Sequence, residues 1–348
     1  MTTPALRAIG WNSFFEDQLA PAELESVILA RVSAHHGSQV ALYGETGEFR
    51  IPVQSAETEG KVAVGDWLVL NDAGNLAIRR LERQTLLARK AAGEEAKPQI
   101  LVVNVNTVFI VCSCNEDFNL SRIERYLAMA LHAGATPVVV LTKADLSDDP
   151  AALVLQAKQL HPGLSVEVMD ARSSEQSSVL QAWCGPGQSV ALLGSSGVGK
   201  STLASALGAG ELATGRIREN DGKGRHTTTS RSLHLLPTGG VLVDNPGVRE
   251  FQLRECEEGV ADLFEDVGEL IAACKFSNCT HIAEPGCAIL AAIQSGALDE
   301  RRYASYQKLQ AEQARNARTL AKRREREQQK TQSIKSAVAK KRRGREDW

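Results

Sequence analysis

The feature that most constrains this chain is GSSGVGKST at residues 194–202, which fits the phosphate-loop pattern G-x-x-x-x-G-K-[ST] at every position. The apolar run VALL precedes it, and the helix-forming run STLASAL follows it. Glycines at these positions let backbone N–H groups cradle phosphates at a helix N-terminus. A glycine-rich turn without a ligand is the alternative, which pattern and context together oppose. We expect Lys200 to reach the β- and γ-phosphates, Ser201 to bind Mg²⁺, and the whole loop to bind nucleotide: Gly194, Ser195, Ser196, Gly197, Val198, Gly199, Lys200, Ser201 and Thr202.

A second nucleotide motif, TKAD at residues 142–145, comes before the phosphate loop. It ends the strand-like run VVVL, and Lys-x-Asp at such a position suits guanine. The stem of Lys143 can lie along the base, while Asp145 can accept hydrogen bonds from the ring N–H and the exocyclic amine, which adenine cannot supply. We include Thr142 and Ala144 in this expected base site. In ordinary GTPases this element follows the phosphate loop, so either the motif is accidental or the domain is reordered.

Two segments after the phosphate loop favour the reordered domain. The run GVLVDNPG predicts a strand ending at Asp244, which can hold Mg²⁺ through water, and Gly247 can offer its N–H to the γ-phosphate. Between the phosphate loop and this strand lies GKGRHTTTSR, a segment suited to an order–disorder switch that senses the γ-phosphate. We expect Thr228, rather than Thr227 or Thr229, to reach Mg²⁺. Together these segments predict a GTPase domain with circularly permuted motif order.

The residue that orients the attacking water is harder to assign from the sequence than the nucleotide ligands are. Many GTPases orient the attacking water with a glutamine just after the DxxG motif, but Val248 stands there and cannot hydrogen-bond a water. His226, beside the threonines, is the nearest substitute, since an imidazole titrates near neutral pH. A solvated loop histidine and an RNA contact are the alternatives for His226.

A cysteine cluster, CKFSNCTHIAEPGC at residues 274–287, indicates a metal site. Its spacing, C-x₄-C-x-H-x₅-C, offers three thiolates and one imidazole, which match a closed tetrahedral structural zinc site. Buried thiols in a reduced core are the alternative. The expected Zn²⁺ ligands are Cys274, Cys279, His281 and Cys287.

The order of the predicted elements indicates a multidomain protein. Short candidate strands separated by turn residues predict a small N-terminal β-barrel, for which an OB-fold is the commonest solution of this size. Strands then alternate with helices, which predicts a parallel α/β sheet, and the remainder reads as helical and zinc-binding. The predicted limits are an extension at 1–24, the barrel at 25–98, the permuted GTPase domain at 99–252, and a zinc-binding helical domain with a basic tail at 253–348.

Charge is distributed unevenly along the chain. Residues 301–348 hold sixteen Lys and Arg against five Asp and Glu, although the formal net charge of the whole chain is −2. A basic tail on an acidic body suggests a polyanionic partner such as RNA; a solvated helix face or a disordered end is the alternative. No stretch has the length of a membrane span, so we expect a cytoplasmic protein without membrane contact. Nothing calls for a dimer, and we expect a monomer.

The run of motifs VGDW, DFNLSRIERYL, TKAD, GSSGVGKST, GRHTTT, DNPG and CKFSNCTHIAEPGC, in that order, resembles the ribosome-small-subunit-dependent GTPase family RsgA, also called YjeQ. The resemblance covers about residues 25–306. It implies an OB-fold, a permuted GTPase domain and a zinc domain. It also implies binding to the small (30S) ribosomal subunit and its 16S rRNA during late maturation, GTP hydrolysis stimulated by the subunit and coupled to release, and a catalytic role for His226.

Among the positions that depart from the family pattern, two lie in the expected base site. Thr142 replaces the more usual Asn, so a side-chain hydrogen bond that braces the site is expected to be weaker. Asp170 and Ala171 stand where a Ser-Ala pair is expected, although the N–H of Ala171 could still read guanine.

Three other functions compete with the leading one. The first is an RNA-binding protein whose nucleotide site is regulatory or degenerate, which Val248 slightly favours. The second is a GTPase acting on the large subunit or another RNA, which only the resemblance opposes. The third is an ATPase, against which Asp145 argues.

Overall fold

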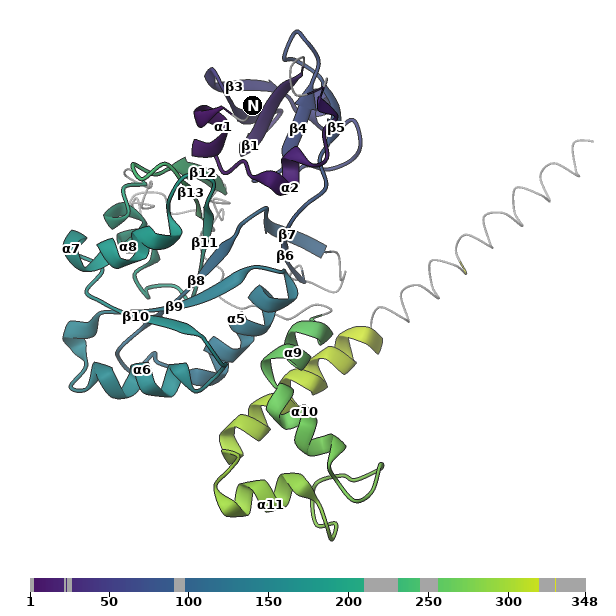
Figure 1. The fold of residues 1–348 in the computed structure, drawn as a ribbon, viewed down its shortest axis with the longest axis vertical. Coiled ribbons are helices and arrows are strands. Elements are labelled where there is room, and N and C mark those ends of the chain that lie inside the picture. The colour runs from purple at the N-terminus through teal and green to yellow at the C-terminus, as the bar shows by residue number, and fades with distance from the viewer. Residues whose placement is uncertain are drawn as a thin grey trace, which may run out of the picture.

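The computed structural model describes residues 3–21, 23, 27–90, 98–209, 231–244, 256–318 and 329. A β-barrel, an α/β domain and a helical lobe follow one another along the long axis of the molecule (Figure 1). Within the described ranges, no helix combines the length and hydrophobicity that a bilayer span requires. The limits of the four predicted domains remain a prediction.

Five short strands form the barrel, as their spacing predicted, in the order β5-β4-β1-β2-β3, which suits a partly open OB-type barrel. All neighbouring pairs are antiparallel, and alternate side chains such as Val32, Leu42 and Leu68 belong to one buried apolar cluster. The elements are β1 (Ile28–His36), β2 (Gln39–Gly44), β3 (Gly47–Pro52), α4 (Val53–Ala56), β4 (Trp67–Leu70) and β5 (Ala77–Arg80).

The N-terminal extension packs against the barrel through aromatic side chains. It contains α1 (Pro4–Ala8) and α2 (Ser13–Glu16). Trp11 is buried edge-on against Trp67 of β4, with ring centroids 4.8 Å apart, and Phe15 lies against the same ring at 5.7 Å. The extension thus adds an aromatic cluster to the outside of the barrel.

The α/β domain contains the predicted alternation of strands and helices. Four neighbouring strand pairs, β10-β9-β8-β11-β13, are parallel, and β12 adds an antiparallel edge. Strands β8 and β11 are buried along their whole length, as expected for strands covered on both faces. The elements are β8 (Thr107–Ser113), α5 (Leu120–His132), β9 (Thr136–Thr142), η1 (Ala144–Leu146), α6 (Pro150–Lys158), β10 (Ser165–Val168), α7 (Ser174–Ser177), η2 (Ser178–Trp183), β11 (Ser189–Leu193), α8 (Lys200–Ala206), β12 (Ser232–Leu235) and β13 (Val241–Asp244).

Barrel and α/β domain are joined more closely than their predicted separation suggests. Strand β1 pairs with β12 at Ala34 and Ser232, so the two sheets are continuous. The hairpin β6 (Leu86–Lys90) with β7 (Pro98–Val103) leads from one domain to the other. Arg31 of β1 is fully buried, at 0% exposure, between the barrel and the α/β domain, where its guanidinium donates hydrogen bonds to Asn104 and Ser189.

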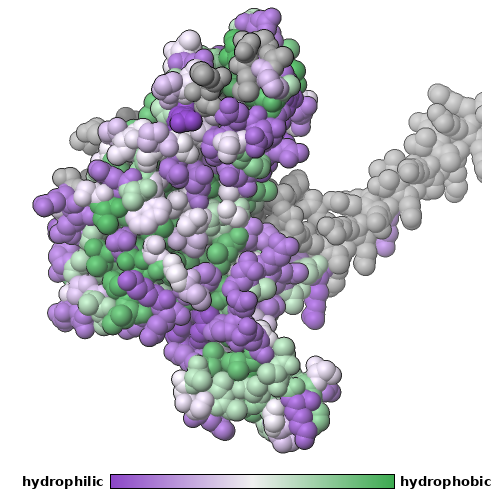
Figure 2. All heavy atoms as spheres, in the orientation of Figure 1, coloured by the Kyte–Doolittle hydropathy of each residue, from purple (hydrophilic) through white to green (hydrophobic). Residues whose placement is uncertain are grey.

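The helical lobe comprises α9 (Glu257–Leu263), α10 (Glu265–Ala272) and α11 (Ala288–Ser295), followed by a helix from residue 300 to 318. Helix α9 crosses α5 so closely that a Cβ at Gly259 would lie 2.1 Å from the carbonyl oxygen of Ala128. Arg301 donates two hydrogen bonds, of 3.0 and 3.2 Å, to the fully buried carboxylate of Glu124 on α5. Figure 2 shows hydrophilic residues gathered on the surface where this lobe meets the α/β domain.

Candidate nucleotide-binding site and metal centre

The phosphate loop lies between β11 and α8, as predicted, and its glycines adopt conformations that other residues avoid. Gly197 and Gly199 have φ of 81° and 99°, in the left-handed region. A Cβ at Gly194 would lie 2.3 Å from the carbonyl oxygen of Val111 on β8. The loop can therefore keep its shape only with glycine at these positions, which leaves its backbone close to any bound phosphate.

Lys200 is held inside this loop. Its Nζ donates hydrogen bonds to the carbonyl oxygens of Gly194, at 2.8 Å, and Ser195, at 2.5 Å. Burial lowers the pKa of Lys200, and the nearby negative charge of Asp244 opposes that shift. The ammonium group is thus positioned over the loop, where phosphate oxygens could replace the carbonyl acceptors.

Thr142 connects the TKAD motif directly to the phosphate loop. Its side chain is fully buried, and its hydroxyl donates to the carbonyl oxygen of Val198 at 2.5 Å, with the carbonyl of Cys112 a second acceptor at 3.3 Å. The sequence led us to expect a weaker brace from threonine than from asparagine. The structure shows that the hydroxyl makes a short brace of its own between the two motifs.

The base-reading segments come together because β9 and β10 are parallel neighbours whose carboxyl ends meet at one edge of the sheet. Lys143 adopts a left-handed conformation, with φ of 55°, at the turn that leads into η1. Ala144 donates its N–H to the carbonyl of Met169, at 3.4 Å, and the buried Ala171 follows two residues later. Asp145, in η1, is partly exposed, as a side chain that reads a ligand must be.

The expected Mg²⁺ ligands are only partly within the described residues. Ser201 lies exposed in the first turn of α8, and Asp244 ends β13, close enough to Lys200 to affect its pKa. Thr228, together with the expected catalytic His226 and the γ-phosphate ligand Gly247, lies outside the described residues. For these three residues the sequence-based assignments remain predictions.

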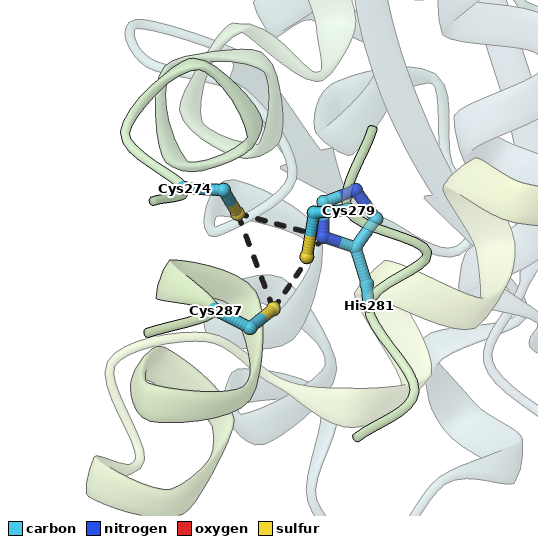
Figure 3. Close-up of side chains that lie close together, drawn as sticks. All are labelled: Cys274, Cys279, His281 and Cys287. Atoms are coloured by element: carbon cyan, nitrogen blue, oxygen red, sulfur yellow. Dashed lines mark hydrogen bonds between the residues drawn. The ribbon is translucent and has the colours of Figure 1, made fainter. Parts of the chain in front are cut away.

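The four residues of the cysteine cluster come together as a candidate metal-binding group of the expected composition (Figure 3). Nδ1 of His281 lies 3.5 Å from Sγ of Cys274 and 3.4 Å from Sγ of Cys287, and these two sulfurs are 4.0 Å apart. With Cys279, all four ligand atoms lie within 4.8 Å of one another. A tetrahedral Zn²⁺ with Zn–S bonds of about 2.3 Å requires sulfurs about 3.8 Å apart, so the donor set fits zinc and leaves no position for a reacting water.

Glu284 holds the loop that carries these ligands, and the sequence analysis did not identify it. Its carboxylate accepts hydrogen bonds from the backbone N–H groups of Thr280 (2.8 Å), Ile282 (3.0 Å) and Ala283 (3.1 Å), and from the hydroxyl of Thr280. These donors hold the pKa of Glu284 well below its usual range. Because the loop also contains His281 at φ 59°, a fixed anchor explains how this strained turn is maintained.

Known proteins resemble the chain over most of its length. Residues 80–254 match the model of the RsgA GTPase family. A small ribosomal subunit biogenesis GTPase RsgA 2 of Vibrio parahaemolyticus is 48% identical over 348 residues, covering 100% of this chain and 96% of that protein. The chain belongs to the RsgA GTPase family. A small ribosomal subunit biogenesis GTPase RsgA of Mesorhizobium japonicum is 45% identical, covering 90% of this chain and 92% of that protein.

Solved structures agree with this RsgA assignment. The crystal structure of YjeQ from Thermotoga maritima matches with a TM-score of 0.60 and 25% identity, covering 81% of this chain and 97% of that one. YloQ, a circularly permuted GTPase, matches in fold with a TM-score of 0.58 and 22% identity, covering 82% and 94%. The permuted motif order predicted from TKAD and the phosphate loop is therefore confirmed.

Besides Thr142, a second side chain contacts the phosphate loop of this RsgA family member, and the sequence did not predict this contact. The side chain of Tyr126, buried on α5, makes a hydrogen bond with that of Ser195, and burial raises the pKa of Tyr126. The same helix carries Glu124 against the helical lobe. The helix itself was predicted, both from the alternation of strands and helices and by DFNLSRIERYL in the family resemblance, but its contact with the phosphate loop was not.

Proposed function

We propose that this protein hydrolyses GTP on the small (30S) ribosomal subunit and assists late maturation of that subunit. The observation that carries the proposal is the connected pair of motifs: a phosphate loop with Lys200 inside it, braced by Thr142 to a strand end that presents Asp145. The relatives are small ribosomal subunit biogenesis GTPases, which supports the small subunit as the partner. The cytoplasm, where ribosomal subunits assemble, is the proposed site of action.

Each part of the nucleotide would have its own ligands. Residues 194–202 would bind the phosphates, and Lys143, Asp145 and the N–H of Ala171 would bind guanine. Ser201, Thr228 and Asp244 would hold Mg²⁺, which neutralises charge on the phosphate oxygens. His226 would orient the attacking water from the threonine-rich segment, with Gly247 donating to the γ-phosphate.

The remaining parts would bind the ribosome. We assign 16S rRNA contacts to the barrel, the Zn²⁺-stabilised lobe and the basic tail, in a monomeric protein. GTP would favour the bound state, and hydrolysis would favour release. If the tail makes roughly six phosphate contacts, affinity should fall about a thousandfold between low and moderate salt.

Cosedimentation tests this cycle. With a non-hydrolysable GTP analogue the protein should pellet with small subunits, and with GDP it should not; large subunits serve as control.

His226→Ala should bind GTP and the subunit but hydrolyse slowly. Deleting residues 319–348 should flatten the salt dependence while sparing Glu312, which pairs with Arg125 of α5 at 2.7 Å. Equal pelleting with both nucleotides, or with large subunits, would contradict the proposal.

A further inference from the structure

The carboxylate expected to read guanine already has a partner in the structure. Nη2 of Arg172 lies 2.9 Å from Oδ2 of Asp145. The same guanidinium contacts Asp170, with Nε 2.9 Å from Oδ1 and Nη2 2.8 Å from Oδ2. Arg172 is therefore shared by two carboxylates, Asp145 after β9 and Asp170 after β10. It lies 27 residues after Asp145 in the sequence.

Local structure fixes the orientation of this arginine. Oδ1 of Asp170 also accepts the backbone N–H of Arg172, at 3.0 Å, in a tight side-chain turn. The backbone N–H of Asp170 donates to Oε1 of Gln176 at 2.7 Å, and its carbonyl accepts the N–H of Ser173 at 2.9 Å. Asp170 is therefore held at both its backbone and its side chain, and its fork-shaped contact aims Arg172 at Asp145.

The contact leaves room for a base. A carboxylate offers about four lone-pair sites on two oxygens, whereas the two donors of a guanine edge need only two. Arg172 occupies one site on Oδ2, so Asp145 can accept both guanine donors while the arginine is bound. The contact with Arg172 restricts rotation of the Asp145 carboxylate before the nucleotide binds. Nucleotide binding then does not have to bear the entropy cost of restricting that rotation.

We propose that Arg172 is a positioning residue that sets the plane of the Asp145 carboxylate, and thereby contributes to selection of guanine. The inference rests on the proposed function, because it assumes that this site binds a guanine nucleotide. It also gives a reason for Asp170 in place of the expected serine: Asp170 orients the arginine that braces the base-reading carboxylate.

Calorimetric titration of the full-length protein with GDP and with IDP tests the proposal. IDP lacks the exocyclic amine, so the ratio of the two dissociation constants measures how well the carboxylate is placed. Arg172→Met should weaken GDP binding about three- to tenfold, a modest change because the pair is partly exposed, and should lower the preference for GDP over IDP. Asp170→Ser should shift the preference in the same direction, and Arg172→Lys should restore it only in part.

Arg79→Met is the matched control. It removes a partly exposed ion pair, Arg79 with Glu23 at 3.2 Å, on the barrel, and should leave the GDP-to-IDP ratio unchanged. An unchanged ratio in Arg172→Met would overturn the inference. Tighter GDP binding by that variant would also overturn it, since Arg172 would then be masking Asp145. Failure of the unsubstituted protein to bind GDP would instead refute the proposed function.

Discussion

Replacing Arg31 with methionine should loosen the junction between barrel and α/β domain. The guanidinium donates to the carbonyls of Ile9 (2.6 Å) and Asn104 (2.6 Å) and to the hydroxyl of Ser189 (2.8 Å). It also donates to the carbonyl of Gly65 at 3.3 Å, which would keep a second donor, Nδ2 of Asn104 at 3.0 Å. These acceptors belong to the N-terminal extension, to the segment before β8 and to the first residue of β11, which leads into the phosphate loop. Methionine fills similar space but donates no hydrogen bond.

The cost follows from the acceptors left behind. A buried carbonyl that loses its donor costs about 1–3 kcal/mol, so two cost roughly 2–6 kcal/mol. Part of this cost is offset, because burial disfavours the charge of the guanidinium. This desolvation lowers the pKa of Arg31 to about 9, and the negative charge of Asp66 opposes it only in part. We therefore expect Arg31→Met to reduce the free energy of unfolding of the barrel by about 3 kcal/mol.

Urea unfolding followed by tryptophan fluorescence measures this effect locally. The guanidinium of Arg31 lies 5.6 Å from the ring centre of Trp67, which packs on Trp11, so two of the four tryptophans of the chain report on this junction. Arg50→Met, at an exposed position on β3, is the control. Ser189→Ala should cost less, and should add little to Arg31→Met because both remove the same bond. An Arg31→Met midpoint equal to that of the unsubstituted protein would refute the reasoning.

Three further predictions concern the two sites and pH. Asp145→Asn should move nucleotide preference from guanine toward xanthine, checked by competition of XDP with GDP, and an unchanged preference would remove Asp145 from the base site. Glu284→Ala should lower the zinc affinity of the lobe, measured by chelator competition, with Glu269→Ala as control; equal affinities would show that the loop holds its shape without the carboxylate. Burial lowers the pKa of His234 from its ordinary 6.5, so the unfolded chain binds more protons below that value, and stability should fall as pH drops from 7 towards 5. His234→Gln should flatten that profile in thermal melts, and an equally steep profile would contradict the assignment.

Local pattern was enough to predict the elements and the position of each motif. The phosphate loop and the strands around it could be predicted because glycine spacing and apolar runs are properties of neighbouring residues. The grouping of the four candidate metal ligands could be predicted because they lie within fourteen residues, Cys274 to Cys287.

What the sequence did not reveal depends on contacts between distant residues or on loop conformation. The brace from Thr142 joins residues 56 apart, and the contact of Arg31 with Ser189 spans 158. No periodicity encodes such pairs, and an arginine in a strand reads as exposed until its neighbours are known. The role of Glu284 could not be predicted, because it depends on the turn around His281, which brings three backbone N–H groups to one carboxylate.

The most direct test of the central claim is steady-state GTP hydrolysis by the full-length protein alone, with small ribosomal subunits, and with large subunits. We predict slow hydrolysis by the protein alone, a rise of orders of magnitude with small subunits, and no rise with large ones. Bound GTP with no stimulation by either subunit would contradict the account and favour an RNA-binding protein whose nucleotide site is regulatory.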